Sequence, residues 1–134
     1  MNFNKKITVL AAVMGALTVL IGAFGAHGLK EIVSEKTITS FETGVRYQMF
    51  HVILLLIIGF SAFIDQKTQK WVSRFFVFGI LLFSGSIYFI ALKDVFLINT
   101  KIFIIATPIG GLLLVAGWLR LAYGIIVNKK IQNF

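Results

Sequence analysis

The sequence predicts an all-α integral membrane protein, a four-helix bundle, and the prediction rests on charge and hydropathy. Residues 7–29, 47–64 and 75–92 contain no Asp, Glu, Lys or Arg, and residues 102–128 contain only Arg120. Hydrophobic residues make up 58% of the 134 residues. An apolar run of about 18 or more residues crosses a bilayer as a helix, and a helix satisfies its own backbone hydrogen bonds, which lipid cannot do. The chain is therefore expected to cross a membrane four times.

The four spans are expected at approximately residues 7–26, 41–64, 72–92 and 102–127, within a single membrane domain that covers residues 1–134. The connection at 65–71 is short and polar, as an antiparallel helical hairpin requires, and residues 93–101 form another short link. Because the spans and their connections use nearly all of these residues, we expect no separate soluble catalytic or binding domain.

The connection between the first and second spans is expected to contain a short amphipathic helix at the membrane surface. At helical spacing, one face of this segment holds Leu29, Ile32, Val33 and Lys36, and its acidic residues lie elsewhere. Thr39 is the expected N-cap of the next helix, because Glu42 follows three residues later and completes a capping box.

The chain has a formal net charge of +8, and its Lys and Arg residues lie mainly at the ends of the expected spans. There they contact anionic headgroups, so we expect membrane lipids as partners and no nucleic acid. Apart from Arg120, the side that holds both termini has seven of these residues and the other side has five. This bias predicts a multi-pass protein of the cell membrane with both termini in the cytoplasm. The two groups are Lys5, Lys6, Lys67, Lys70, Arg74, Lys129 and Lys130, and Lys30, Lys36, Arg46, Lys93 and Lys101.

Small residues recur along the first and fourth spans at spacings that place them on one helix face. In lipid, close backbone approach through such residues drives helix association. We therefore expect these faces to pack against neighbouring helices. The residues are Ala11, Gly15, Thr18, Gly22 and Gly25 in the first span, and Gly110, Gly117 and Gly124 in the fourth.

Polar residues within the spans gather at similar depth, in the half away from the termini. Polar side chains inside a membrane are costly and often functional, and four helices that agree in depth are more specific than any single residue. These residues form a candidate ligand site or polar cluster. The members are His27, Tyr47, Gln48, His51, Ser84, Ser86, Tyr88 and Thr107.

The same residues have a plainer interpretation. Ser and Thr in membrane helices often bond only to a backbone carbonyl one turn away, and Tyr and His often belong to the interfacial belt. As a group, the polar residues are equally consistent with a ligand site and with a clasp that only joins the helices.

Specific chemistries find little support in the sequence. The chain has two His residues and no Cys, and it lacks zinc-binding spacings such as HExxH, so we expect no metal and no cofactor. A Ser–His hydrolase would need Ser84 or Ser86 beside His51, but the GxSxG pattern is missing, so we name no catalytic residue. Pro108 is expected to kink or locally unwind the fourth span.

Four sequence motifs resemble those of the DUF423 family, also called UPF0382, of small bacterial membrane proteins. They are GAFGAHGL (22–29), TGVRYQMFH (43–51), LFSGSIYFIAL (82–92) and TPIGG followed by Gly117-Trp118. They occur in family order, and the resemblance covers nearly the whole chain. The resemblance implies a four-span helical protein and assigns no activity. Arg120 falls where the family pattern leads us to expect an apolar residue.

Two classes of function follow. The first is a non-enzymatic membrane protein that binds a small solute or lipid headgroup at the polar cluster, in the non-cytoplasmic half of the bundle. A transport pathway would require a homo-oligomer, because four short spans enclose little volume. The alternative is a structural or accessory membrane protein whose cluster only clasps the helices, and a Ser–His enzyme is a distant third. The classes differ in whether His27, His51, Ser86 and Tyr88 line a water-accessible cavity or bind one another.

Overall fold

The computed structural model describes residues 3–128, and all regular structure within this range is helical. Four helices are long and apolar enough to cross a membrane. This confirms the predicted all-α fold with four spans. The elements are α1 (Lys5–His27), the 3-10 turn η1 (Leu29–Glu31), α2 (Glu35–Phe60), α3 (Gln66–Ala91), α4 (Lys93–Phe96) and α5 (Lys101–Ile126).

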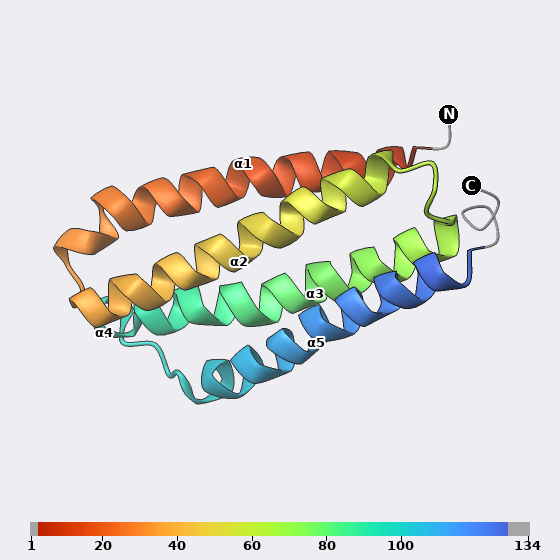
Figure 1. The fold of residues 1–134 in the computed structure, drawn as a ribbon. Helices are drawn as coiled ribbons and strands as arrows, with labels where there is room; N and C mark the ends of the chain where they lie inside the picture. The colour runs from red at the N-terminus through yellow and green to blue at the C-terminus, as the bar shows by residue number, and fades with distance from the viewer. Residues whose placement is uncertain (1–2, 129–134) are drawn as a thin grey trace.

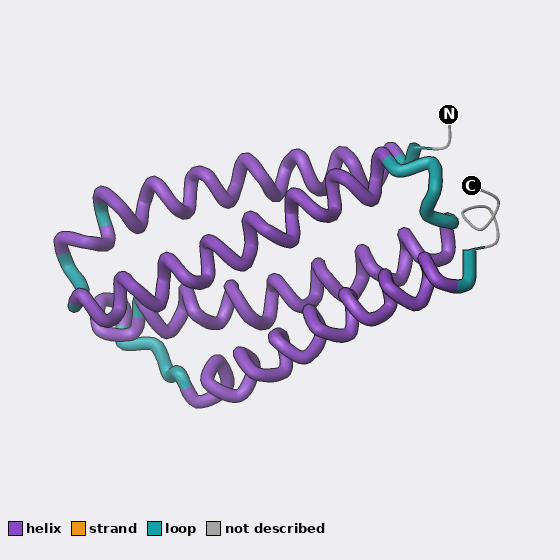
Figure 2. The backbone as a smooth tube through the Cα atoms, viewed as in Figure 1, coloured by secondary structure: helices purple, strands orange, loops and turns teal. Residues whose placement is uncertain are grey.

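The long helices pack in chain order, with α1 against α2, α2 against α3 and α3 against α5 (Figure 1). The connections lie at the two ends of the bundle, as the tube in Figure 2 shows. We call one end the terminal end, which holds Asn4, the 61–65 connection and Asn128. The other is the loop end, which holds the 28–34 and 92–100 connections.

The second long helix begins at the loop end with Ser34 as its N-cap, so the predicted cap at Thr39 is wrong. The Ser34 hydroxyl accepts a hydrogen bond from the Thr37 amide at 3.2 Å. Thr39 already lies in the helix, where its hydroxyl donates to the Glu35 carbonyl at 2.9 Å. Serine caps a helix as well as threonine does, and it occurs five residues earlier in the chain.

The connection before α2 differs from the amphipathic helix expected there. It contains the single 3-10 turn η1, and α2 takes up the following residues from Glu35. Leu29 is buried in a small cluster with Ile38, Phe41 and Ala91, whereas Ile32 is 58% exposed. The apolar residues of this segment thus divide between the bundle and its surroundings. The second span also ends at Phe60, short of the predicted residue 64, because Asp65 caps α3 after a brief connection.

A larger apolar core occupies the middle and the terminal end of the bundle, and all four long helices contribute to it. The outer faces of α1 and α5 expose large apolar side chains such as Leu20 and Leu119, at 66% and 67%. Lipid solvates such faces at no cost. The buried members of the core are Ile7, Ala11, Val52, Leu55, Ile58, Val72, Phe76, Ile80, Leu114 and Leu121.

The predicted small-residue faces are packing surfaces. On α1, a Cβ added at Gly25 would lie 2.6 Å from the Phe41 ring of α2. On α5, a Cβ at Gly110 would collide with the backbone of Leu82 and Phe83 in α3. α5 also stays helical through Pro108, so the helix is not unwound there.

Gly110 is the position where a methyl group should cost most, because its neighbour on α3 is backbone and cannot rotate away. We expect Gly110→Ala to destabilise the protein by about 1–3 kcal/mol, as overpacking of a tight contact does. Thermal unfolding in detergent, followed by circular dichroism, measures this loss.

Gly111→Ala is the matched control, since a Cβ there would meet only the Phe83 ring at an ordinary 3.7 Å. It should unfold at or above the wild-type temperature, because alanine favours a helix over glycine. Equal losses in both variants would contradict the close contact between α3 and α5.

Candidate functional site

Three helices are joined by a chain of side-chain hydrogen bonds in the loop-end half of the bundle. The Tyr88 hydroxyl of α3 donates to Gln48 Oε1 of α2 at 2.8 Å. Gln48 Nε2 donates to Thr18 Oγ1 of α1 at 2.8 Å, and the Thr18 hydroxyl donates to the Met14 carbonyl at 2.7 Å. Gln48 and Thr18 are buried. We call Thr18, Gln48 and Tyr88 the polar clasp. Thr18 was predicted only as a small packing residue.

Two serines of α3 bind the helices on either side of it. The Ser84 hydroxyl donates to the Gly44 carbonyl of α2 at 2.7 Å. The hydroxyls of Ser86 and Thr107 lie 2.6 Å apart and join α3 to α5. Both serines are buried, where lipid and apolar side chains cannot hydrogen-bond to a hydroxyl group. The bonds to the neighbouring helices therefore satisfy the two serine hydroxyls.

His51 is held at both ring nitrogens. Trp118 Nε1 of α5 donates to His51 Nε2 at 3.1 Å, so Nδ1 is the nitrogen that carries the hydrogen and donates to the Tyr47 carbonyl at 2.6 Å. The edge of the ring packs against Phe76 of α3, with centroids 5.0 Å apart. His51 therefore faces the bundle interior as a tether between α2 and α5. From the sequence, Trp118 was identified only as part of a family motif, and its hydrogen bond to His51 was not predicted.

The eight predicted residues do not form one continuous site. Six of them make hydrogen bonds between helices: Gln48, His51, Ser84, Ser86, Tyr88 and Thr107. Within residues 3–128 the exposed His27 side chain has no hydrogen-bond partner, and Tyr47 is 43% exposed with its ring against Phe83. Neither predicted serine is bonded to His51 in this range, so a Ser–His pair is not assembled.

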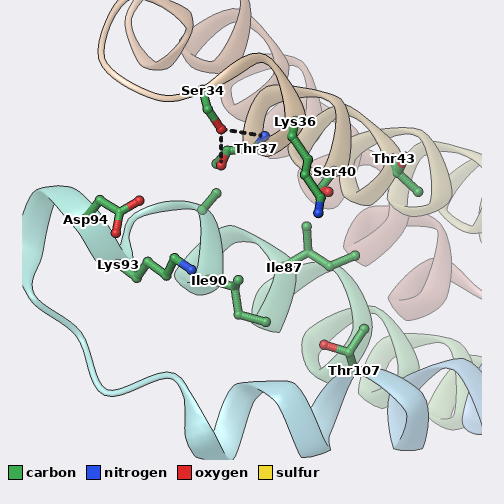
Figure 3. A pocket seen from close by; sticks show the side chains of 11 residues that line it. Ser34, Lys36, Thr37, Ser40, Thr43, Ile87, Ile90, Lys93, Asp94 and Thr107 are labelled. Atoms are coloured by element: carbon green, nitrogen blue, oxygen red, sulfur yellow. Dashed lines mark hydrogen bonds between the residues drawn. The ribbon is translucent and has the colours of Figure 1, made fainter.

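A cavity of about 560 Å³ opens at the loop end, between the start of α2 and the end of α3. We call it the loop-end cavity. Lys36 extends into it from α2 and Lys93 from α4, as Figure 3 shows. Thr107 forms part of its lining and connects it to Ser86. The full lining is Ser34, Lys36, Thr37, Ser40, Thr43, Ile87, Ile90, Ala91, Lys93, Asp94 and Thr107.

The lining of the loop-end cavity suits an anion. It has two ammonium groups and one carboxylate, that of Asp94, together with the hydroxyls of α2. Ammonium and hydroxyl groups donate hydrogen bonds to phosphate or carboxylate oxygens. Among the described residues, no three His, Asp or Glu side chains lie close enough together to hold a metal ion. Sequence analysis missed the cavity because Lys36 and Lys93 are far apart in the chain.

A second polar cluster lies at the terminal end and was not predicted. Asp65 Oδ2 accepts a hydrogen bond from the Thr68 hydroxyl at 2.6 Å, and Arg120 Nη1 of α5 donates to the same hydroxyl oxygen at 3.0 Å. The Thr68 hydroxyl lowers the pKa of Asp65. This cap therefore contributes stability above about pH 4 and loses it as the pH falls through the lowered pKa. Nearby, Gln69 Nε2 donates to the Ile58 and Ser61 carbonyls, each at 3.0 Å.

Comparison with known proteins identifies the family. Residues 21–111 match the sequence model described as "Protein of unknown function (DUF423)". The chain belongs to the DUF423 family. This confirms the resemblance drawn from the four motifs.

Relatives in this family are similar over nearly their whole length. The chain is 41% identical over 128 residues to a "UPF0382 membrane protein" of Haemophilus influenzae, covering 96% of this chain and 98% of the relative. It is 39% identical over 117 residues to a namesake from Staphylococcus epidermidis, covering 87% and 92%. It is 34% identical over 130 residues to the "UPF0382 inner membrane protein YgdD" of Escherichia coli, covering 95% and 94%. No solved structure matches. The protein is thus a multi-pass membrane protein of the UPF0382 type.

The polar clasp should contribute measurably to stability, because each member leaves a partner unpaired when removed. Gln48→Leu removes the hydrogen-bond partner of both the Thr18 and the Tyr88 hydroxyl, and we expect a loss of about 1–3 kcal/mol in the free energy of unfolding. Tyr88→Phe removes one hydrogen bond and should lower the free energy of unfolding by about 0.6 kcal/mol, the average contribution of a side-chain hydrogen bond between membrane helices. Chemical unfolding of the purified variants in detergent gives both values.

The double variant tests the direct contact, since the two losses should not add. Tyr47→Phe is the control, because no hydrogen bond to its hydroxyl is seen within the described residues and its removal should change little. Additive losses for Gln48 and Tyr88 would show that the clasp is not formed.

Proposed function

We propose that the protein is a non-enzymatic membrane protein that binds a small anionic solute or lipid headgroup in the loop-end cavity. The observation that supports this most is the approach of Lys36 and Lys93, from different helices, to one space lined by hydroxyls. Asp94 offsets only one of the two positive charges at this cavity, so an anion bound between the lysines is attracted by the remaining charge. Of the eight predicted polar residues, Thr107 alone lines this cavity, so the ligand lies beside the other seven.

The position of the cavity supports a ligand that arrives at the membrane surface. Its polar lining comes mainly from Ser34, the first turns of α2 and α4, while Ile87 and Ile90 form an apolar wall on α3. Thr107 links this space to the hydrogen bond that joins α3 and α5. A bound anion can therefore act on the contact between these helices.

A structural or accessory role is the second candidate, and the occupied hydrogen bonds favour it. Six of the eight predicted residues already bind another helix, as a clasp requires. In that case the polar residues fix the bundle, and function lies in contacts of its surface with lipids or partner proteins.

The distribution of charge supports an orientation for the cavity. Apart from Arg120, the sequence assigns seven Lys and Arg residues to the side predicted to hold both termini and five to the other side. The positive-inside rule places the terminal side in the cytoplasm. The loop-end cavity then faces the non-cytoplasmic side.

Ligand binding should raise the temperature of thermal unfolding. The probes are inorganic phosphate, glycerol phosphate and short-chain phosphatidylglycerol, and a ligand at 100 times its Kd adds about 2.7 kcal/mol to stability. Lys36→Gln and Lys93→Gln should each reduce the shift. Lys30→Gln removes the same charge at the same end, outside the cavity lining, and should retain it. If no probe shifts unfolding, or if Lys30→Gln reduces the shift equally, the structural role is favoured.

The orientation can be tested by labelling, because the chain contains no cysteine. Single cysteines at Glu31 and Lys67 occupy exposed positions at opposite ends. An impermeant maleimide should label position 31 in intact cells and position 67 only after the membrane is opened. The reverse pattern would place the cavity in the cytoplasm.

A further inference from the structure

A narrow groove of about 230 Å³ lies at the terminal end, between the starts of α1 and α3. Lys6 of α1 and Lys70 and Arg74 of α3 border it, and Ile7 and Leu10 supply its apolar part. We call it the basic groove. It uses other residues and the other end of the bundle, so it is independent of the loop-end cavity.

The fold brings these three cations together, and contacts of the helices that carry them fix where Lys6 and Arg74 lie. Lys70 and Arg74 are four residues apart and therefore share one face of α3. The Asn4 amide donates to the Gly59 carbonyl at 2.7 Å, which holds the start of α1 against the end of α2. The Arg74 guanidinium lies over the Trp71 ring, 5.3 Å from its centroid.

Within residues 3–128, no Asp or Glu side chain lines the basic groove. Among the described residues, Asp65 is the only Asp or Glu at the terminal end, and it lies outside the groove lining, where its carboxylate accepts hydrogen bonds from Thr68. The other four acidic residues, Glu31, Glu35, Glu42 and Asp94, belong to the loop-end half. Like charges four residues apart destabilise a helix, so an external anion at the groove is stabilising.

The apolar part of the groove indicates what kind of anion this is. Leu10 is 40% exposed beside the three cations, and Val13 and Leu17 continue an exposed apolar strip along α1. A free phosphate would contact only the charged rim. A phospholipid presents a phosphate with hydrocarbon directly below it, and basic pockets between membrane helices bind such headgroups.

We propose that the basic groove binds the phosphate of an anionic phospholipid, with one acyl chain along the Leu10 face of α1. Zwitterionic lipids carry their own ammonium group, which the three cations repel. The groove should therefore prefer phosphatidylglycerol to phosphatidylcholine in either leaflet, whichever way the protein is oriented.

Native mass spectrometry of the detergent-purified protein, titrated with each lipid, measures this preference. Each of Lys70→Gln and Arg74→Gln should weaken phosphatidylglycerol binding about fivefold, the value of roughly 1 kcal/mol per cation near an anionic surface. Lys67→Gln removes the same charge from the same end of α3 outside the groove and should leave binding unchanged. All three side chains are exposed, so the fold should tolerate the changes.

A measurement on the unmutated groove complements these variants. Trp71 lies beneath Arg74, so brominated phosphatidylglycerol in mixed vesicles should quench its fluorescence more than brominated phosphatidylcholine does. Trp71→Phe should remove the difference, because the remaining Trp118 lies on α5.

Three results would overturn the proposal. In the first, phosphatidylglycerol and phosphatidylcholine bind equally and quench Trp71 equally. In the second, Lys67→Gln weakens binding as much as Lys70→Gln does, which indicates that the protein attracts the lipid through a diffuse surface charge. In the third, millimolar inorganic phosphate displaces phosphatidylglycerol, which assigns the groove to a soluble anion.

Discussion

The approach of α5 to α3 is the constraint on which the interior of this protein depends. Glycines spaced by seven, at positions 110, 117 and 124, leave no room for a Cβ between the two helices. Only at such a distance can the short hydroxyls of Ser86 and Thr107 meet at 2.6 Å. The same contact places Trp118 within reach of His51 and Arg120 within reach of Thr68. Small residues thus allow polar side chains of the two helices to meet, whereas large residues at the same positions would keep the helices apart.

Polar groups serve different purposes at different depths. In the middle of the bundle they are consumed in pairs, because an unpaired donor or acceptor in an apolar surrounding is costly. Near the two ends, water and headgroups can solvate charge, so lysines and an arginine line the loop-end cavity and the basic groove. Depth therefore separates groups that hold the fold from groups that are available to ligands.

Sequence predicted the spans well because a charge-free run is a local property and needs no knowledge of neighbours. It also predicted the packing faces, since helical spacing alone places small residues together. The capping site failed because Ser34 and Thr39 are chemically similar, and only the path of the 28–34 connection selects between them. The clasp and the cavity depend on how each helix is rotated about its axis and on which residues of separate helices meet. Pairings such as Thr18 with Gln48, which are 30 residues apart, follow from that rotation and could not be predicted from the sequence.

The serial packing of the long helices bears on how the protein is made. The extensive backbone contacts join consecutive spans, α1 with α2, α2 with α3 and α3 with α5. A nascent chain releases its spans in that order, so each helix that enters the bilayer finds its partner already there. Assembly can proceed during synthesis, and contacts between near neighbours in sequence form quickly. α5 enters after α3 and closes the glycine contact with it, so this close contact forms only after α3 is in place.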